Sequence, residues 1–180
     1  MIIIITGTPG TGKTTAANFL SEKLNYGCIR INDIAGEVCT GMEGGSKVID
    51  IKKLSKKIKK MIQGDAIIEG HLSHLLGIGD VVIVLRTNPK ILKQRLTVQG
   101  FKGEKLSENL EAEALDACLI ESLERHARVY EINTSEKTPD AVVEDILKIL
   151  KGETDEYKPG KIDWSEEYFS AGADRDCQIE

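Results

Sequence analysis

The sequence predicts a single α/β domain with a parallel sheet covered by helices on both faces. Two observations indicate this fold class. Short apolar runs with the length of buried strands alternate along the chain with longer segments of helical periodicity. The first of these runs leads directly into a glycine-rich turn and then into the start of a helix. At 180 residues the chain has room for one domain with a full core.

The first strand is expected at residues 2–6, and a phosphate-binding loop follows it. The segment GTPGTGKT, residues 7–14, fits the pattern G-x-x-x-x-G-K-[ST]. Glycines let the backbone come close to a phosphate, and the free N–H groups of the next helix hold its negative charge. We therefore predict a P-loop NTPase that binds a nucleoside triphosphate through Gly10, Gly12, Lys13, Thr14 and Thr15. The Thr14 hydroxyl is also a candidate ligand for Mg²⁺.

Four further strands are expected at residues 28–31, 66–69, 81–85 and 129–132. The third strand of the chain ends in Glu69, and an acid at such a strand end holds Mg²⁺ in P-loop enzymes. His71 follows two positions later and is a candidate for orienting water or a phosphoryl oxygen, the alternative being an ordinary loop histidine. Lys13, Glu69 and His71 are thus the predicted catalytic residues, with Thr14 and Glu69 as the metal ligands.

Helices are expected between the strands. Residues 50–63 form an amphipathic segment that Asp50 is placed to cap. Six lysines occupy its polar face, which is either a solvated surface or a contact for RNA or a substrate phosphate. The last helix of the body, over residues 138–151, begins with Thr138 and Pro139 and ends before Gly152. Residues 39–47, with three glycines, are typical of a mobile loop.

Two segments are candidates for contacting the substrates. Asp33, just after the second strand, either faces a phosphoryl acceptor or caps the short helix that follows. The segment from Gln99 to Lys105 contains two glycines and two lysines, Lys102 and Lys105. It is typical of a mobile lid that closes over phosphates and excludes water.

Charge and composition narrow the functional classes. Residues 1–150 hold 20 basic and 20 acidic side chains, whereas residues 151–180 hold 4 and 9, so general binding to nucleic acid is not indicated. The acidic tail carries four of the eight aromatics and either docks on the body or a partner, or extends loosely. Four scattered cysteines form no C-x-x-C pair. Together with the lack of a signal peptide or a membrane-length apolar run, they predict a cytoplasmic protein with no membrane partner.

These motifs together resemble the adenylate kinase 6 family. Its members are small nucleoside-monophosphate kinases that are also described as maturation factors of the small ribosomal subunit. The resemblance covers essentially the whole body. It rests on GTPGTGKTT (7–15), INDIA (31–35), IIEGH (67–71), VLRT…LKQRL (84–96) and GFKGEKLSENLEAEALD (100–116). The tail segment PGKIDWSEEY (159–168) is similar to archaeal members.

The resemblance implies a three-layer kinase domain at residues 1–150 with a five-stranded parallel sheet, followed by the tail at 151–180. It implies two mobile parts, a monophosphate-binding segment at about 30–53 and a lid at about 99–109. The implied reaction is the reversible, Mg²⁺-dependent transfer of the ATP γ-phosphoryl group to AMP or a related monophosphate. ATPase activity and partners on the pre-ribosome, the ribosomal protein uS11 and rRNA, are also implied. Gln99 is assigned to ATP, and Asp33, Lys102 and Lys105 to the substrate.

Two positions depart from the family. Gln99 stands where the family usually has arginine before the lid, and Gly36 stands where eukaryotic members commonly have arginine. An arginine fork suits phosphate geometry, which a lysine does not reproduce. These departures favour an alternative, an ATPase assembly factor that switches a ribosomal-protein interaction with weak or no kinase activity. The small size and the two expected flaps favour the kinase.

Overall fold

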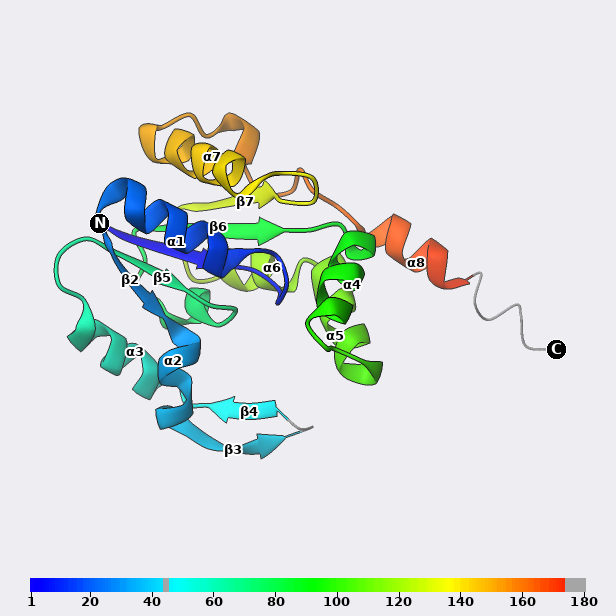
Figure 1. The fold of residues 1–180 in the computed structure, drawn as a ribbon, viewed down its shortest axis with the longest axis horizontal. Helices are drawn as coiled ribbons and strands as arrows, with labels where there is room; N and C mark the ends of the chain where they lie inside the picture. The colour runs from blue at the N-terminus through cyan, green and yellow to red at the C-terminus, as the bar shows by residue number, and fades with distance from the viewer. Residues whose placement is uncertain (44–45, 174–180) are drawn as a thin grey trace.

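A five-stranded parallel sheet lies at the centre of the computed structural model, which describes residues 1–43 and 46–173 (Figure 1). The strands have the order β2-β5-β1-β6-β7. Their bounds are β1 (Ile2–Thr6), β2 (Gly27–Arg30), β5 (Ala66–Glu69), β6 (Val81–Arg86) and β7 (Val129–Asn133). The predicted fold class is confirmed, and each expected strand agrees with an observed one to within one residue at either end.

Helices cover both faces of the sheet, which gives the three layers. On one face, α1 (Lys13–Leu24) and α7 (Pro139–Lys151) pack over Ile3 and Ile5. On the other face, α3 (Ile51–Met61) and α6 (Ala117–Leu123) pack over Ile4. Successive residues of a strand point to opposite faces, so an uninterrupted apolar run is what a sheet buried on both faces requires.

The parallel register brings the functional strand ends to one edge. Ile5 of β1 pairs with Glu69 of β5, and Thr6 pairs with Val84 of β6. The loop after β1 and the carboxylate at the end of β5 therefore lie side by side. In open α/β sheets, ligands bind at this carboxyl edge of the strands.

Two arms extend beyond this edge (Figure 1). One contains α2 (Ile31–Ala35), a 3-10 turn (Gly36–Val38) and an antiparallel hairpin of β3 (Cys39–Glu43) and β4 (Ser46–Ile49). The other contains α4 (Pro89–Val98) and α5 (Gly103–Ala114), which pack on each other.

The expectation of a loop over residues 39–47 was wrong. The β-branched and apolar residues Thr40, Met42 and Val48 alternate with small or polar ones there, and β3 and β4 pair through Cys39 and Ile49. Of the three glycines that suggested the loop, Gly41 lies within β3, and Gly44 and Gly45 lie outside the described residues. The expected lid is also largely regular, because α5 begins at Gly103.

The predicted helix ends agree with the structure. The Asp50 carboxylate accepts from the Lys53 N–H at 3.0 Å at the start of α3. The Thr138 hydroxyl accepts from the Ala141 N–H at 3.3 Å at the start of α7, and Gly152 ends that helix at φ 97°. None of the helices in the described ranges combines the length and apolar character needed to cross a bilayer.

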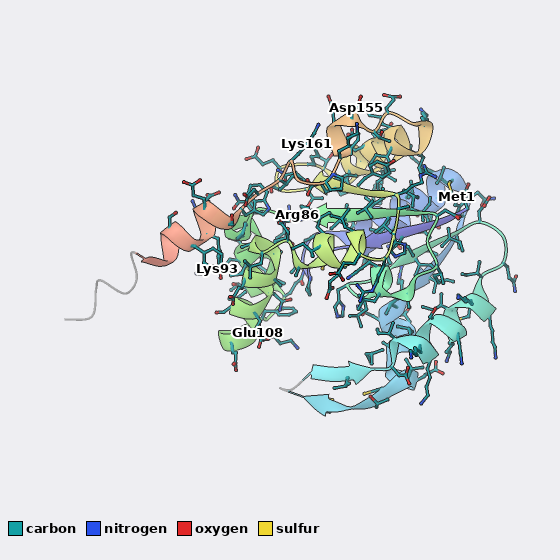
Figure 2. The ribbon with its side chains drawn as sticks, turned by 180° about the vertical axis from the view of Figure 1, so that it is seen from behind. Met1, Arg86, Lys93, Glu108, Asp155 and Lys161 are labelled. Atoms are coloured by element: carbon teal, nitrogen blue, oxygen red, sulfur yellow. The ribbon has the colours of Figure 1, made fainter. Side chains whose placement is uncertain are left out.

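The described part of the tail packs against the body. The Tyr157 ring is 6% exposed in the core beneath α7, and its hydroxyl donates to Asp145 at 2.7 Å. The N–H groups of Lys161 and Ile162 donate to the Glu131 carboxylate at 2.8 and 3.1 Å. Figure 2 shows this crossing from behind, with Lys161 near the sheet end that carries Arg86.

The last helix, α8 (Ser165–Ala173), continues onto the second arm. Tyr168 packs against Leu92, Leu96 and Leu110 of α4 and α5. Glu167 pairs with Lys90 at 2.7 Å. The aromatic residues of the tail thus include two that contact buried apolar surface of the body.

Replacing Tyr157 by alanine should lower the free energy of unfolding by about 3–5 kcal/mol, because a buried aromatic ring would leave a cavity under α7. Tyr157→Phe keeps the ring and loses one hydrogen bond to a carboxylate, so its loss should be smaller, about 1.5–3 kcal/mol. Urea unfolding of both variants measures the difference. A wild-type unfolding midpoint for Tyr157→Ala would contradict the placement of the tail in the core.

Candidate active site

The loop between β1 and α1 has the backbone conformation that its glycines permit. Gly10 and Gly12 have φ of 88° and 95°, which other residues rarely adopt. A Cβ at Gly10 would lie 2.9 Å from Leu92, so the loop is packed against α4 there. A Cβ at Gly12 would have no neighbour within 4 Å, and α1 has no side-chain cap. The N–H groups at the start of α1 are therefore open to an anionic ligand.

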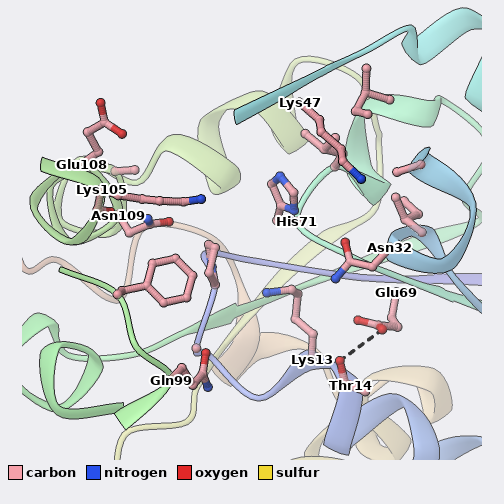
Figure 3. Close-up of a pocket in the computed structure, with 18 of the residues that line it drawn as sticks. Lys13, Thr14, Asn32, Lys47, Glu69, His71, Gln99, Lys105, Glu108 and Asn109 are labelled. Atoms are coloured by element: carbon pink, nitrogen blue, oxygen red, sulfur yellow. Dashed lines mark hydrogen bonds between the residues drawn. The ribbon is translucent and has the colours of Figure 1, made fainter. Parts of the chain in front are cut away.

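Lys13 lies at the end of this loop. Its ammonium donates to the Thr8 carbonyl at 2.9 Å, and its side chain is directed into a cavity (Figure 3). Burial lowers the Lys13 pKa, whereas Cys118 and the carboxylates of Glu69 and Glu113 act in the opposite direction. The side chain is only 9% exposed, so its charge acts in surroundings of low polarity.

Thr14 and Glu69 are in contact. The Thr14 hydroxyl donates to the Glu69 carboxylate at 3.1 Å, and Glu69 is 3% exposed (Figure 3). The described residues hold no group of three His, Cys, Asp or Glu side chains suited to a metal. Two adjacent hard oxygen ligands fit Mg²⁺, which takes one or two protein ligands and completes its shell with phosphates and water. The residues present therefore fit a Mg²⁺·nucleotide.

His71 follows Glu69 and also faces the cavity (Figure 3). Loss of solvent, with smaller effects from Lys13 and His74, lowers the His71 pKa to about 4. The imidazole is therefore neutral at physiological pH, and one of its ring nitrogens is free to accept a hydrogen bond.

The cavity has a volume of about 970 Å³ and lies between the two arms. We name its three sides by their elements. The donor side is the phosphate loop with Lys13, Thr14 and Thr15. The acceptor side is formed by α2, Gly36 and the β3–β4 hairpin, and the lid side is formed by α5 and the turn before it.

Most of the predicted site residues meet in this cavity. It is lined by Gly10, Gly12, Lys13, Thr14, Thr15, Glu69, His71, Gln99 and Lys105. Asp33 and Lys102 are exposed and do not line it. On α2, a step of one residue turns the side chain by about 100°, so Asn32 faces the cavity where Asp33 does not. A role for Asp33 or Lys102 in substrate binding stays a prediction.

The sequence prediction missed four polar residues of this cavity: Asn32, Lys47, Glu108 and Asn109. Asn32 stands within INDIA, and Glu108 and Asn109 stand within GFKGEKLSENLEAEALD, so the motifs marked the right segments without marking these side chains. Lys47 lies within the expected monophosphate-binding segment of about 30–53, but its side chain was not singled out, because residues 39–47 were interpreted as a loop.

A smaller cavity of about 250 Å³ adjoins the phosphate loop and shares Gly10, Gly12 and Thr15 with the large one. Arg95 lines it and donates to the carbonyls of Thr134 and Ser135 at 3.0 and 3.1 Å. The two cavities thus meet at the residues that would hold phosphates.

A buried charge cluster, the Arg86 cluster, supports the loop from beneath. Arg86 is 1% exposed and donates to Glu113 at 2.9 Å and Glu131 at 3.1 Å, and it also pairs with Asp116. Glu113 in turn accepts from the Thr8 hydroxyl at 2.5 Å. Burial opposes the charge of Arg86, but its carboxylate partners outweigh burial and its pKa is raised. The cluster joins the phosphate loop to β6, α5 and β7.

Comparisons with known proteins agree with this geometry. A protein-family profile described as "AAA domain" matches residues 3–116. The chain is 42% identical over 170 residues to a Pyrococcus abyssi protein named "Putative adenylate kinase", with 93% of each chain covered. A Methanococcus maripaludis protein of the same name is 43% identical, with 94% of this chain and 98% of that one covered.

Solved structures share the fold. Shikimate kinase from Acinetobacter baumannii, solved with shikimate, superposes with a TM-score of 0.62 at 16% identity over 84% of this chain and 93% of that one. Shikimate kinase from Bacteroides thetaiotaomicron gives 0.57 at 17% identity, over 84% and 98%.

The fold and the phosphate loop define the chain as a P-loop protein of the α/β class. Within that class, it belongs to the family of the archaeal proteins that carry the adenylate kinase name. The resemblance seen in the sequence motifs is confirmed.

Arg86→Met should lower the free energy of unfolding by about 3–5 kcal/mol, because Glu113 and Glu131 would be left buried without their counter-charge. Arg125→Met removes an exposed arginine paired with Glu124 at 3.1 Å and should cost less than about 1 kcal/mol. Urea unfolding of both variants at neutral pH makes the comparison. Equal losses would show that the Arg86 cluster does not hold these elements together.

His71→Asn should reduce the acid sensitivity of folding. In the unfolded chain a histidine takes up its proton near pH 6.5, whereas folded His71 stays neutral to about pH 4. Its effect on stability is therefore absent above pH 6.5, and some stability is lost as the pH falls from 6.5 towards 4; because the His71 side chain is partly exposed, solvent screens part of this loss. The unfolding free energy of the variant should fall less steeply across this window. Parallel curves for the two proteins would show that His71 is not shielded from protonation.

Proposed function

We propose that this chain is a nucleoside-monophosphate kinase that transfers the ATP γ-phosphoryl group to AMP or a related monophosphate. The observation that carries this proposal is the single cavity that joins the phosphate loop to a second, separate arm. Its volume of about 970 Å³ is at the upper end of the roughly 300–1,000 Å³ typical of small-molecule sites. It leaves space beside the donor phosphates for an acceptor.

The donor side would hold ATP by its phosphates. The open N–H groups at the start of α1 and the Lys13 ammonium are placed for the β- and γ-phosphate oxygens. Thr14 and Glu69 would hold Mg²⁺, directly or through water. When bound, the ion neutralises charge on the β- and γ-phosphates. The smaller cavity behind the loop is the place for the remainder of the nucleotide.

In the phosphoryl transfer itself, no side chain of the protein has to form a covalent bond. An acceptor phosphate oxygen forms a bond to the γ-phosphorus while the bond to the β–γ bridging oxygen breaks, so the donor leaves as ADP and the acceptor becomes a nucleoside diphosphate. An ionised phosphate needs no general base, so alignment and charge neutralisation carry the catalysis. This agrees with a cavity whose donor side presents Lys13 and backbone N–H groups.

The lid side would complete the site. Lys105 lines the cavity from the first turn of α5, and its ammonium lies 5.7 Å from the centre of the Phe101 ring. Gln99 and Asn109 add polar groups nearby. We infer that residues 99–109 act as the lid, with Lys105 as a point charge on the phosphates and Phe101 excluding water.

A specific observation also favours ATP hydrolysis as an accompanying activity. The neutral His71 imidazole faces the cavity beside the proposed Mg²⁺ ligand Glu69. A water that donates to His71 would stand near the γ-phosphate when no acceptor is bound. The predicted ribosomal partners, uS11 and rRNA, depend on the family resemblance alone, and the lysine face of α3 is where an RNA contact would be sought.

Incubation of the protein with ATP and Mg²⁺, with and without AMP, tests the proposal. ADP should form with AMP present, with little release of free phosphate. Lys13→Ala should reduce this transfer by at least about 100-fold, because it removes a cation from the charge that develops on the phosphates. Lys93→Ala, on the exposed surface of α4, is the matched control and should leave the rate unchanged. Phosphate release that ignores AMP would identify the protein as an ATPase instead.

A further inference from the structure

We propose that Lys47 of β4 is the cation that binds the acceptor's phosphate, and that Gly36 provides the space for its ammonium. This inference depends on the proposed kinase function, because it assigns the acceptor subsite of the same cavity. It names a substrate class, a nucleoside monophosphate, held by its phosphate on the acceptor side.

The first argument is the distribution of positive charge. Three lysines line the cavity among the described residues, and each belongs to a different side. Lys13 stands on the donor side, Lys105 on the lid side and Lys47 on the acceptor side. A phosphate monoester carries a charge of about −1.5 to −2 at pH 7, so a subsite for it needs a cation of its own. Lys47 is the acceptor-side residue that supplies one.

The second argument is the position of the Lys47 ammonium. A Cβ built on Gly36 would lie 3.8 Å from Nζ of Lys47 and near no other group. The ammonium therefore lies over the end of α2, in the space that a side chain at position 36 would enter. Gly36 has φ −57° and ψ −31°, which any residue adopts, so the backbone does not require glycine there. Figure 3 shows Lys47 directed into the cavity toward Asn32.

The third argument is that two described acids, one beside Gly36 and one three residues after Lys47, are engaged with other lysines. Glu37 pairs with Lys57, and Asp50 pairs with Lys53 at 3.5 Å. Among the side chains that the structure describes, no carboxylate lies within 4 Å of the Lys47 ammonium. An ammonium that points into a cavity without a carboxylate partner is available to an anionic ligand.

The surroundings suit the rest of a nucleotide. Met42 and Ile49 line the acceptor side with apolar surface, against which a base and ribose can pack. The Asn32 amide offers both donors and an acceptor at the same wall. Lys47 is thus the charged group in a subsite that is otherwise apolar and amide-like.

Steady-state kinetics with AMP as the varied substrate test the assignment. Lys47→Met should raise the KM for AMP about tenfold or more and leave the KM for ATP within about twofold, because one charge-assisted contact is lost. Lys93→Met removes the same charge from the exposed surface of α4, outside the cavity, and should leave both values unchanged. An equal effect of the two substitutions would overturn the proposal, because only long-range charge would then be at work.

A second variant tests whether a different cation at the same place restores AMP binding. Gly36→Arg in the Lys47→Met background places a guanidinium where the ammonium was, and the backbone at position 36 accepts a side chain. The double variant should recover most of the lost affinity for AMP. A double variant as weak as Lys47→Met would show that a cation at this place is not what the acceptor needs.

Calorimetric binding of AMP, without ATP, separates this inference from the proposed function. Weaker binding to Lys47→Met than to the wild type supports the subsite, whether or not phosphoryl transfer occurs. Equal binding to both proteins overturns the subsite and leaves the kinase standing if AMP is phosphorylated. A wild-type protein that binds none of AMP, CMP, GMP and dAMP would overturn both.

Discussion

The charge pairing of one buried arginine holds the site together. Arg86 ends β6, and its guanidinium contacts carboxylates from α5 and β7. Glu113 extends that pairing to Thr8 in the phosphate loop, and Glu131 extends it to the backbone N–H groups of Lys161 and Ile162 in the tail. Burying an unpaired carboxylate costs several kcal/mol, about 3–5 kcal/mol when its partner is removed, and the positive charge of the guanidinium offsets that cost for each of them. The position of the phosphate loop relative to the lid helix therefore depends on a group that never touches a substrate.

The cavity above this cluster has the opposite character. Three ammonium groups approach it from three different elements, and only Glu69 and Glu108 are acids in its described lining. Three ammonium groups against two carboxylates leave the lining with a net positive charge, which favours phosphate ligands. Under the proposed function, Lys13 and Lys47 address different phosphates, one on the donor and one on the acceptor. The neutral His71 between them adds no further positive charge.

The comparisons show how a shared fold leaves room for this specialisation. The shikimate kinases share the fold at 16–17% identity, whereas the archaeal relatives match at 42–43% over nearly the full length, including much of the tail. The phosphate loop of such a fold determines where the phosphates of a nucleotide bind. The residues of the other arm determine which second substrate can bind beside them. In this chain that arm consists of α2, a 3-10 turn and the β3–β4 hairpin, and Lys47 of the hairpin lines the cavity. The docked tail stabilises the lid side through Tyr168 and the sheet end through Glu131.

The sequence by itself determined the features that depend on local pattern. Five apolar strands, the phosphate loop, Glu69 at a strand end, and the caps at Asp50 and Thr138 were predictable, because each is encoded within a few neighbouring residues. Only the tertiary structure decided the rest. Thr8 meets Glu113 across 105 positions, and Tyr157 enters a core built mainly by earlier segments. Helical phase turned Asn32 rather than Asp33 to the cavity, and strand pairing brought Lys47 over Gly36. These contacts join residues that are far apart in the sequence. The residues next to them in the chain do not predict the contacts, because the contacts depend on how the elements pack.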